Sequence, residues 1–259
     1  MTVSYRIEDD IAVLTLDDVP RHNALSRAMI AELNRLHARS IRDGARALVL
    51  GANGPSFCAG ANIDDLRSGW MEGGDPETDP LHLFRRLATD LRVTIAAVQG
   101  LAAGGGLELT LACDLVVAGE RAVFLAPELE HGVIPPLGVA LLPSIVGRHR
   151  AMDMVLTRRR VGAEEAVRIG LATQRVEADD VISAAVTLAR SIVDKVPPGA
   201  LGVVKQQLNH HQKLDWQSIL TCSGEVPAAE WREGLDAFMQ KRRPDYDPFW
   251  SKSGKGIRP

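Results

Sequence analysis

The stretch TIAAVQGLAAGGGLELTLACDLVVA, residues 94–118, decides the fold class of this chain. Its first apolar run, Thr94 to Gln99, predicts a buried strand, and the three glycines at 104–106 predict a tight turn. A helix is expected next, followed by another buried strand from Leu115 to Ala118. A strand, a turn, a helix and a second strand are the repeating unit of an α/β domain with parallel pairing.

The same alternation precedes this stretch. Two alternating apolar segments, Val3 to Ile7 and Ile11 to Leu16, flank the acidic turn Asp9-Asp10 and predict an opening β-hairpin. Ser26 predicts the N-cap of an amphipathic helix that runs to about Ile41. A strand and a helix are then expected at Ala47 to Leu50 and near Leu81 to Leu91.

The pattern changes after about Val181, where the strand signals stop. Pro197-Pro198 marks a joint inside this last part of the chain. Three amphipathic helices are expected there, at Ile182 to Val193, Ala200 to Leu208 and Ala229 to Lys241.

Composition limits the class of protein. The 259 residues are 46% hydrophobic and 24% charged, the balance of an ordinary globular protein with a sizeable core. A net charge of −3 gives no overall field that attracts nucleic acid or an anionic membrane surface. The chain has no apolar run near the roughly 20 residues of a membrane helix, and its start, MTVSYRIEDD, lacks the pattern of a secretory signal. We therefore expect a cytoplasmic protein.

Cysteine and histidine spacing argues against a disulfide framework and a metal site. Cys58, Cys113 and Cys222 are odd in number and widely spaced, so we expect reduced, structural thiols. His210 and His211 are adjacent in a polar helix, and the other histidines form no HExxH or HxH pattern. We expect no metal.

The glycines at 104–106 suggest a site that polarises a carbonyl group. Glycine lets a ligand approach the backbone, and the start of a helix presents unpaired N–H groups. A tight strand-to-helix crossing that needs small residues explains the glycines equally well. A dinucleotide site is not expected, because the GxGxxG pattern is absent and Leu109 stands three places after Gly106.

Glu108 is the candidate for acid–base chemistry beside that turn. It lies three positions after Gly105, so its side chain leans back toward the helix start. Apolar neighbours raise the pKa of a carboxyl group and the helix terminus lowers it, and the sequence alone does not decide between them. A second turn of small residues, FCAGANID at 57–64, is either the other half of a two-donor hole or a sharp loop after a strand.

FCAGANI at 57–63 and VQGLAAGGGLELTLACDLVVA at 98–118 resemble the paired signatures of the enoyl-CoA hydratase/isomerase, or crotonase, family. The resemblance implies an α/β fold with a spiral of ββα turns over residues 1–196 and a helical region over 197–259 for trimerisation and site closure. It also implies a homotrimer or homohexamer. The likeness extends through three further segments: PRHNALS (20–26), VLTRRRVGAEEAVRIGLATQRV (155–176) and EGLDAFMQKRRPDY (233–246).

The resemblance also implies catalytic roles. The backbone N–H groups of Ala61 and Gly105 form an oxyanion hole for a thioester carbonyl. Glu108 matches the first catalytic glutamate of the hydratases and Glu128 the second, while Glu130 is a neighbouring alternative that breaks the spacing. We expect Glu108 to activate water and Glu128 to donate a proton to the α carbon.

Coenzyme A is expected as part of the substrate, with no separate cofactor. Arg21 is expected near its phosphates, although an ordinary solvated surface charge is the alternative for Arg21 and for Lys241. By resemblance, the residues that bind coenzyme A are Arg21, Ala59, Asn62 and Ile63, with Phe238 and Lys241 from a neighbouring subunit.

One departure from the family pattern bears on the reaction. Pro136 stands where hydratases commonly have a glycine whose N–H helps to position water, and proline has no N–H. Hydration of a 2-enoyl-CoA is the expected reaction, and a double-bond shift on one carboxylate is the alternative. A coenzyme A-binding protein without chemistry is a third interpretation. The polar loop Gly69 to Asp79, with Trp70 and Met71, is either a surface loop or a lid.

Overall fold

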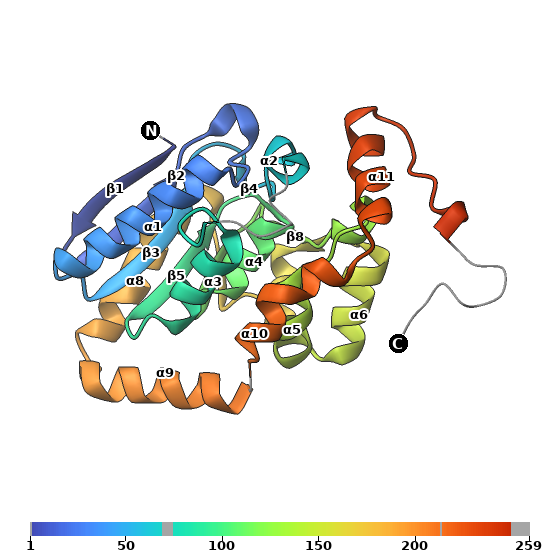
Figure 1. The fold of residues 1–259 in the computed structure, drawn as a ribbon. Coiled ribbons are helices and arrows are strands. Elements are labelled where there is room, and N and C mark those ends of the chain that lie inside the picture. Colours follow the sequence, from blue (N-terminus) through green and yellow to red (C-terminus); the bar gives the residue numbers. More distant parts are fainter. Residues whose placement is uncertain (1, 69–74, 213, 250–259) are drawn as a thin grey trace.

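Three times along the chain, an apolar strand of a larger sheet is followed by a short strand of a smaller sheet (Figure 1). The computed structural model describes residues 2–68, 75–212 and 214–249. Within them the larger sheet has the strand order β1 (Val3–Glu8), β2 (Ile11–Leu16), β3 (Ala47–Ala52), β5 (Val93–Val98), β7 (Leu115–Gly119) and β10 (Gln174–Val176). The smaller sheet has the order β4 (Ser56–Cys58), β6 (Leu101–Ala103), β8 (Val123–Leu125) and β9 (Val161–Gly162).

The opening hairpin and the parallel pairing are both confirmed. β1 and β2 run antiparallel, with Val3 opposite Leu16. Asp9 and Asp10 join them with φ angles of 47° and 63°, the left-handed conformation that a two-residue hairpin turn requires. From β2 to β10 every neighbouring pair of the larger sheet is parallel.

The helices begin close to the predicted positions. Ser26 is the N-cap of α1, and its hydroxyl oxygen accepts the Met29 N–H at 3.2 Å. The α-helices are α1 (Arg27–Arg42), α2 (Ile63–Arg67), α3 (Pro80–Thr89), α4 (Gly105–Leu111), α5 (Pro136–Val146), α6 (Arg148–Thr157), α7 (Ala163–Arg168), α8 (Val181–Val193), α9 (Pro198–Gln212), α10 (Trp216–Thr221) and α11 (Ala228–Met239). Single 3-10 turns form η1 (Val19–Arg21), η3 (Glu128–His131), η4 (Ala178–Asp180), η5 (Cys222–Glu225) and η6 (Asp247–Phe249).

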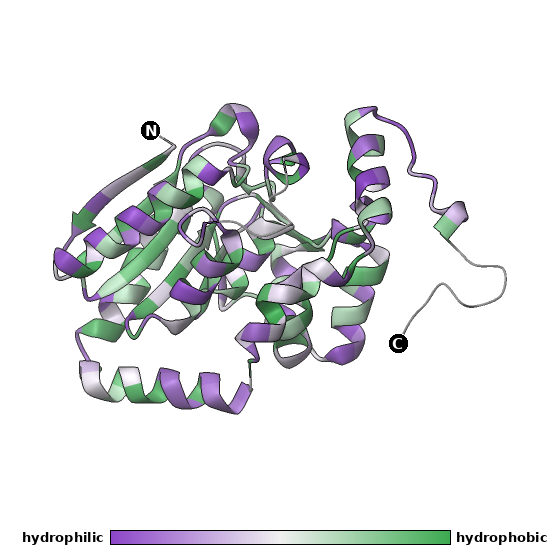
Figure 2. Cartoon of the chain, in the orientation of Figure 1, coloured by the Kyte–Doolittle hydropathy of each residue, from purple (hydrophilic) through white to green (hydrophobic). Residues whose placement is uncertain are grey.

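The larger sheet is buried on both faces, which explains why its central strands are continuously apolar. In β2, Ile11 and Val13 point to the face that α8 covers, where they pack with Val181 and Ala185. Leu14 and its alternate neighbours point to the opposite face, into the main core. Figure 2 accordingly shows β3 and β5 in hydrophobic green.

The three parallel strands of the smaller sheet end on the same side of it. β4, β6 and β8 are parallel neighbours, so their carboxyl ends meet on the same side. The chain passes from β4 to α2, from β6 to α4 and from β8 to η3. Because these strands are only three residues long, the sequence pattern did not reveal them, although their positions decide where the candidate site residues lie.

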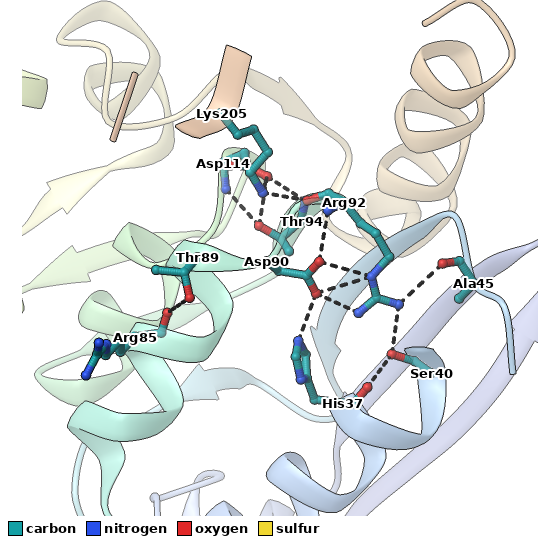
Figure 3. A network of polar contacts seen from close by, with 10 residues as sticks. All are labelled: His37, Ser40, Ala45, Arg85, Thr89, Asp90, Arg92, Thr94, Asp114 and Lys205. Atoms are coloured by element: carbon teal, nitrogen blue, oxygen red, sulfur yellow. Dashed lines mark hydrogen bonds and ion pairs between the residues drawn. The ribbon is translucent and has the colours of Figure 1, made fainter. Parts of the chain in front are cut away.

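A polar network ties α1, α3 and α9 to the sheet (Figure 3). Asp90 accepts from Arg92 at 2.6 Å and lies 2.8 Å from His37 Nε2. Although burial opposes it, hydrogen bonds from His37 and Arg92 hold the pKa of Asp90 well below its ordinary range. Lys205 of α9 is buried and donates to Asp114 Oδ2 at 2.6 Å. This contact fixes the helical C-terminal part against the start of β7.

A membrane-spanning helix is absent from the part of the chain that the structure describes, because none of its helices is both long enough and apolar enough. Cys58, Cys113 and Cys222 are not joined by disulfides in the structure, and Cys58 is buried. Among the same residues, the structure contains no group of three His, Cys, Asp or Glu side chains that could hold a metal ion.

Candidate active site

A cavity of about 1140 Å³ opens where β4, β6 and β8 end. Segments following these strands form one wall, and α3, η5 and α11 form the others. Four of the residues with predicted catalytic roles line it together: Ala61, Gly105, Glu108 and Glu128. The parallel pairing of the three short strands therefore brings together residues that are up to 67 positions apart, 128 minus 61.

The N–H groups of Ala61 and Gly105 form a pair of unused donors. Ala61 pairs with Leu25 as an isolated parallel bridge, in which Leu25 bonds the residues on either side of Ala61, not Ala61 itself. Gly105 is the first residue of α4, where N–H groups have no partner inside the helix. A methyl carbon placed on Gly105 would lie 3.7 Å from Ala61 N, so the two donors are close neighbours. This arrangement suits a single carbonyl oxygen.

Two glycines shape the turn that presents these donors. Gly104 has a φ angle of 54° with ψ of −125°, a conformation in which side chains are strained. A methyl carbon on Gly106 would lie 2.2 Å from Cys58 O, which excludes any side chain at this crossing of β4 and α4. The packing interpretation of the glycine run holds at Gly106, while the donor role of Gly105 stays a prediction.

Glu108 is anchored by the start of α5. Its Oε1 accepts the N–H of Leu137 at 2.7 Å and the N–H of Gly138 at 3.1 Å. Burial raises the pKa of the Glu108 carboxyl group, and these two backbone donors oppose that rise. The net effect raises the pKa of Glu108 to about 7, and the pKa would be higher without the two donors, which stabilise the charged form.

Glu128 has the opposite environment. It opens η3, it is buried, and neither carboxyl oxygen has a hydrogen-bond partner among the described residues. A methyl carbon on Gly104 would lie 3.2 Å from Glu128 Oε1, so the carboxyl group sits against the donor turn. Burial, followed by the negative charge of Glu108, raises the pKa of Glu128. The neutral acid is the favoured form.

Glu130 lies outside this arrangement. It does not line the cavity, and its exposed carboxylate pairs with Arg158 Nη1 at 2.6 Å. Of the two glutamates, therefore, only Glu128 lines the cavity.

The predicted coenzyme A residues divide into two groups. Arg21, Ala59, Asn62, Ile63 and Phe238 line the cavity, whereas Lys241 lies beyond the end of α11 and does not. Asn62 has a structural role as well, because its Oδ1 caps α2 by accepting the Asp64 N–H at 3.0 Å.

Phe238 reaches the cavity from the same chain. Its ring packs edge-on against His131, with the ring centres 5.0 Å apart. The predicted contribution of Phe238 and Lys241 from a neighbouring subunit stays a prediction.

Gly132 and Gly234 allow α11 to pack closely against η3 beside the cavity, a contact that the sequence did not predict. A methyl carbon on Gly234 would lie 2.2 Å from the carbonyl carbon of His131, and one on Gly132 would lie 2.6 Å from Glu230 O. The backbones of α11 and η3 therefore touch. η3 begins with Glu128, so α11 packs on the segment that positions this acid.

The proposed lid falls partly outside the described residues. Trp70 and Met71 belong to residues 69–74, about which the structure makes no statement. Asp79, at the described end of that loop, lines the cavity and caps α3 by accepting the Leu81 N–H at 2.7 Å.

Comparisons with known proteins agree over most of the chain. The family model described as enoyl-CoA hydratase/isomerase matches residues 6–248. The chain is 36% identical over 261 residues to a probable enoyl-CoA hydratase of Rhodobacter capsulatus, covering 95% of this chain and 97% of the relative. It is 34% identical over 255 residues to the 1,2-epoxyphenylacetyl-CoA isomerase of Escherichia coli K12, covering 93% and 96%.

A solved structure agrees with the fold. The crystal structure of an enoyl-CoA hydratase/isomerase from Pseudoalteromonas atlantica T6c superposes with a TM-score of 0.84 at 30% identity. The match covers 95% of this chain and 99% of that chain.

Proposed function

Because this chain belongs to the enoyl-CoA hydratase/isomerase family, we propose that it adds water across the 2,3 double bond of a 2-enoyl-CoA thioester. The observation that carries this proposal is the contrast between two acids in one cavity. Glu108 has two backbone donors on its carboxylate, whereas Glu128 has none and is buried. Hydration needs one base and one acid at the same time, and this contrast supplies them.

The thioester carbonyl is proposed to accept from the N–H groups of Ala61 and Gly105. When water adds at the β carbon, negative charge moves onto this oxygen as an enolate. A preorganised donor of this kind contributes about 3 to 4 kcal/mol in well-studied sites.

In the proposed reaction, the oxygen of water bonds to the β carbon while Glu108 takes one of its protons. The electron pair of the double bond moves to the α carbon and the carbonyl oxygen. Glu128 then delivers its proton to the α carbon, which yields the 3-hydroxyacyl thioester. Both acids return to their starting states when Glu108 releases its proton and Glu128 gains one from solvent.

A double-bond shift is the second candidate, and Pro136 is the observation that favours it. Pro135 and Pro136 have no N–H, and the next two N–H groups of α5 already bind Glu108. The start of α5 thus offers no further donor to hold a water molecule. An isomerase needs only one carboxylate to carry a proton between two carbons.

Turnover of crotonyl-CoA, followed by loss of its enoyl absorbance, tests these candidates. For a hydratase, Glu108→Gln and Glu128→Gln should each lower the rate by on the order of 10²-fold or more. Glu130→Gln, on the exposed neighbour, is the matched control and should retain the rate. If Glu128→Gln hydrates as fast as the parent while Glu108→Gln is inactive, the two-acid mechanism is wrong. Binding of coenzyme A without any turnover would indicate the binding protein.

We also propose that residues 197–259 serve oligomerisation and site closure, in a homotrimer or homohexamer. Apolar side chains on α9 support this, because Val203, Val204 and Leu208 are all more than half exposed, at 57%, 54% and 61%. Light scattering of the purified chain tests the proposal, and a monomer at micromolar concentration would contradict it.

A further inference from the structure

Charge is distributed unevenly along the cavity. Arg21 is the one arginine or lysine among the described residues that line it. It lies in η1 beside the end of β4, where Ala59 donates its N–H to His22 O at 3.0 Å. His131 also lines the cavity, but burial lowers the pKa of its imidazole and so favours the neutral ring. The Arg21 end is therefore the one that suits the phosphates of coenzyme A.

The other end is bounded by α3, α10 and η5. α10 packs against α3 and α5, and α3 packs against α4, the helix that carries Glu108. Figure 1 shows α10 on the opposite side of α4 from α2. A CoA thioester bound as proposed, with its phosphates near Arg21 and its carbonyl at Gly105, would extend its acyl chain past Glu108 toward this wall.

Apolar side chains and two acidic side chains line this wall. Its apolar lining consists of Leu81, Phe84, Pro136 and Leu220. Its charged lining residues are Asp79, at the start of α3, and Glu225, at the end of η5. Within the described chain, no arginine or lysine lines this end. A carboxylate placed there would lose water without gaining a cation, and it would face two like charges.

We infer that the cavity selects CoA thioesters with an uncharged acyl group and rejects acyl chains that end in a carboxylate. This inference rests on the proposed use of a CoA thioester as substrate. It identifies α3 and η5 as the elements that decide acyl specificity, with Glu225 as the charged residue open to substitution, because its side chain is exposed and caps no helix.

Hexanoyl-CoA and adipyl-CoA provide the test, since they have equal chain length and differ in one terminal carboxylate. Calorimetric titration of the full chain at fixed salt should give a dissociation constant about tenfold or more higher for adipyl-CoA. Glu225→Arg should lower the ratio of the two constants by about threefold or more, because it replaces a like charge with an opposite one. Glu177→Arg makes the same charge change on an exposed residue that does not line the cavity, and it should leave the ratio unchanged.

The outcomes separate this inference from the proposed function. Binding of hexanoyl-CoA with weak binding of adipyl-CoA, and a ratio that responds only to Glu225→Arg, supports both. Equal binding of the two ligands overturns the acyl selectivity and leaves the proposed use of CoA thioesters standing. A ratio that shifts equally in both variants overturns the assignment of Glu225. Failure of both ligands to bind rejects the CoA thioester itself, and the inference falls with it.

Discussion

Glu108 Oε1 accepts the backbone N–H of Leu137 at 2.7 Å, which joins the α4 carboxylate to the first turn of α5. Helix starts normally leave several N–H groups free. Here two of those positions are prolines, and the next two N–H groups bind the same carboxylate oxygen. The two donors thus stabilise the charged form of Glu108, and the helix start has no remaining donor.

Pro136→Gly should therefore raise the rate of crotonyl-CoA hydration. The substitution adds one N–H beside Glu108, and a single hydrogen bond to water is worth about 0.5 to 1.5 kcal/mol, or a factor of about 2 to 12. The measurement is the ratio of hydration to 3-enoyl isomerisation. Pro198→Gly makes the same change at the start of α9, away from the cavity, and should leave that ratio alone. A hydration rate that is unchanged or lower in a folded Pro136→Gly variant would contradict this role of Pro136.

Glu128 should make the folded chain less stable at alkaline pH. Between the ordinary pKa of a glutamate and the raised pKa of Glu128, the folded state holds a proton that the unfolded state has released. The free energy of unfolding then falls as pH rises, by up to about 1.4 kcal/mol per pH unit for one proton. Glu128→Gln should remove this contribution.

Thermal unfolding of the wild type, Glu128→Gln and the exposed control Glu130→Gln from pH 4 to pH 9 checks this expectation. A buried amide without partners lowers the stability of Glu128→Gln at every pH. The informative quantity is therefore how the difference in stability between Glu128→Gln and the wild type changes with pH. As pH rises, the stability of Glu128→Gln relative to the wild type should increase. Parallel curves for the wild type and Glu128→Gln would show that Glu128 has an ordinary pKa.

Much of the fold was predictable because its signals are local. Ser26 capped a helix as expected, the Asp9-Asp10 turn joined two strands, and the helices after Val181 appeared near the expected residues. The predicted crotonase spiral is confirmed by the solved relatives. Residue propensities and the period of the hydrophobic pattern decide such features over short stretches of sequence.

The site was predictable only in part. Glycine motifs and acid spacing led to Ala61, Gly105, Glu108 and Glu128, all of which line one cavity. The partners of these groups could not be predicted, because they depend on packing between distant segments. The N–H of Leu137 reaches Glu108 from 29 residues away. Pro136 at the first position of α5 was the available signal for that helix, and its effect on backbone donors was expected from the sequence alone.

Lys205 should contribute to stability through Asp114. The Lys205 side chain is 7% exposed, and its ammonium group donates to a carboxylate that also accepts the Thr94 N–H at 2.7 Å. Lys205→Met leaves that carboxylate without its cation, and we expect a loss of about 3 kcal/mol in the free energy of unfolding. Urea denaturation measures it, with the exposed Lys195→Met as control. The double variant Lys205→Met/Asp114→Asn should recover much of the loss, and a double variant no more stable than Lys205→Met would contradict the pairing.

Gly234 should position Glu128 from a distance. A side chain at Gly234 overlaps the carbonyl carbon of His131, so Gly234→Ala must move α11 away from η3. Tyr246, whose hydroxyl donates to Glu130 O at 3.0 Å, follows α11 and would be displaced with it. We expect water to reach the Glu128 carboxyl group, which lowers its pKa toward the ordinary value because burial is the first cause of the rise.

The Gly234→Ala variant should therefore lose activity and also change its pH dependence. We expect kcat to fall by about tenfold, as for a displaced general acid. The alkaline limb of the pH profile, where Glu128 loses its proton, should move to lower pH. Gly199→Ala adds a methyl group to α9 where no atom lies within 4 Å, and it should keep both the rate and the profile. A Gly234→Ala variant that loses stability but keeps the alkaline limb in place would show that α11 only holds the fold together and does not set the acidity of Glu128.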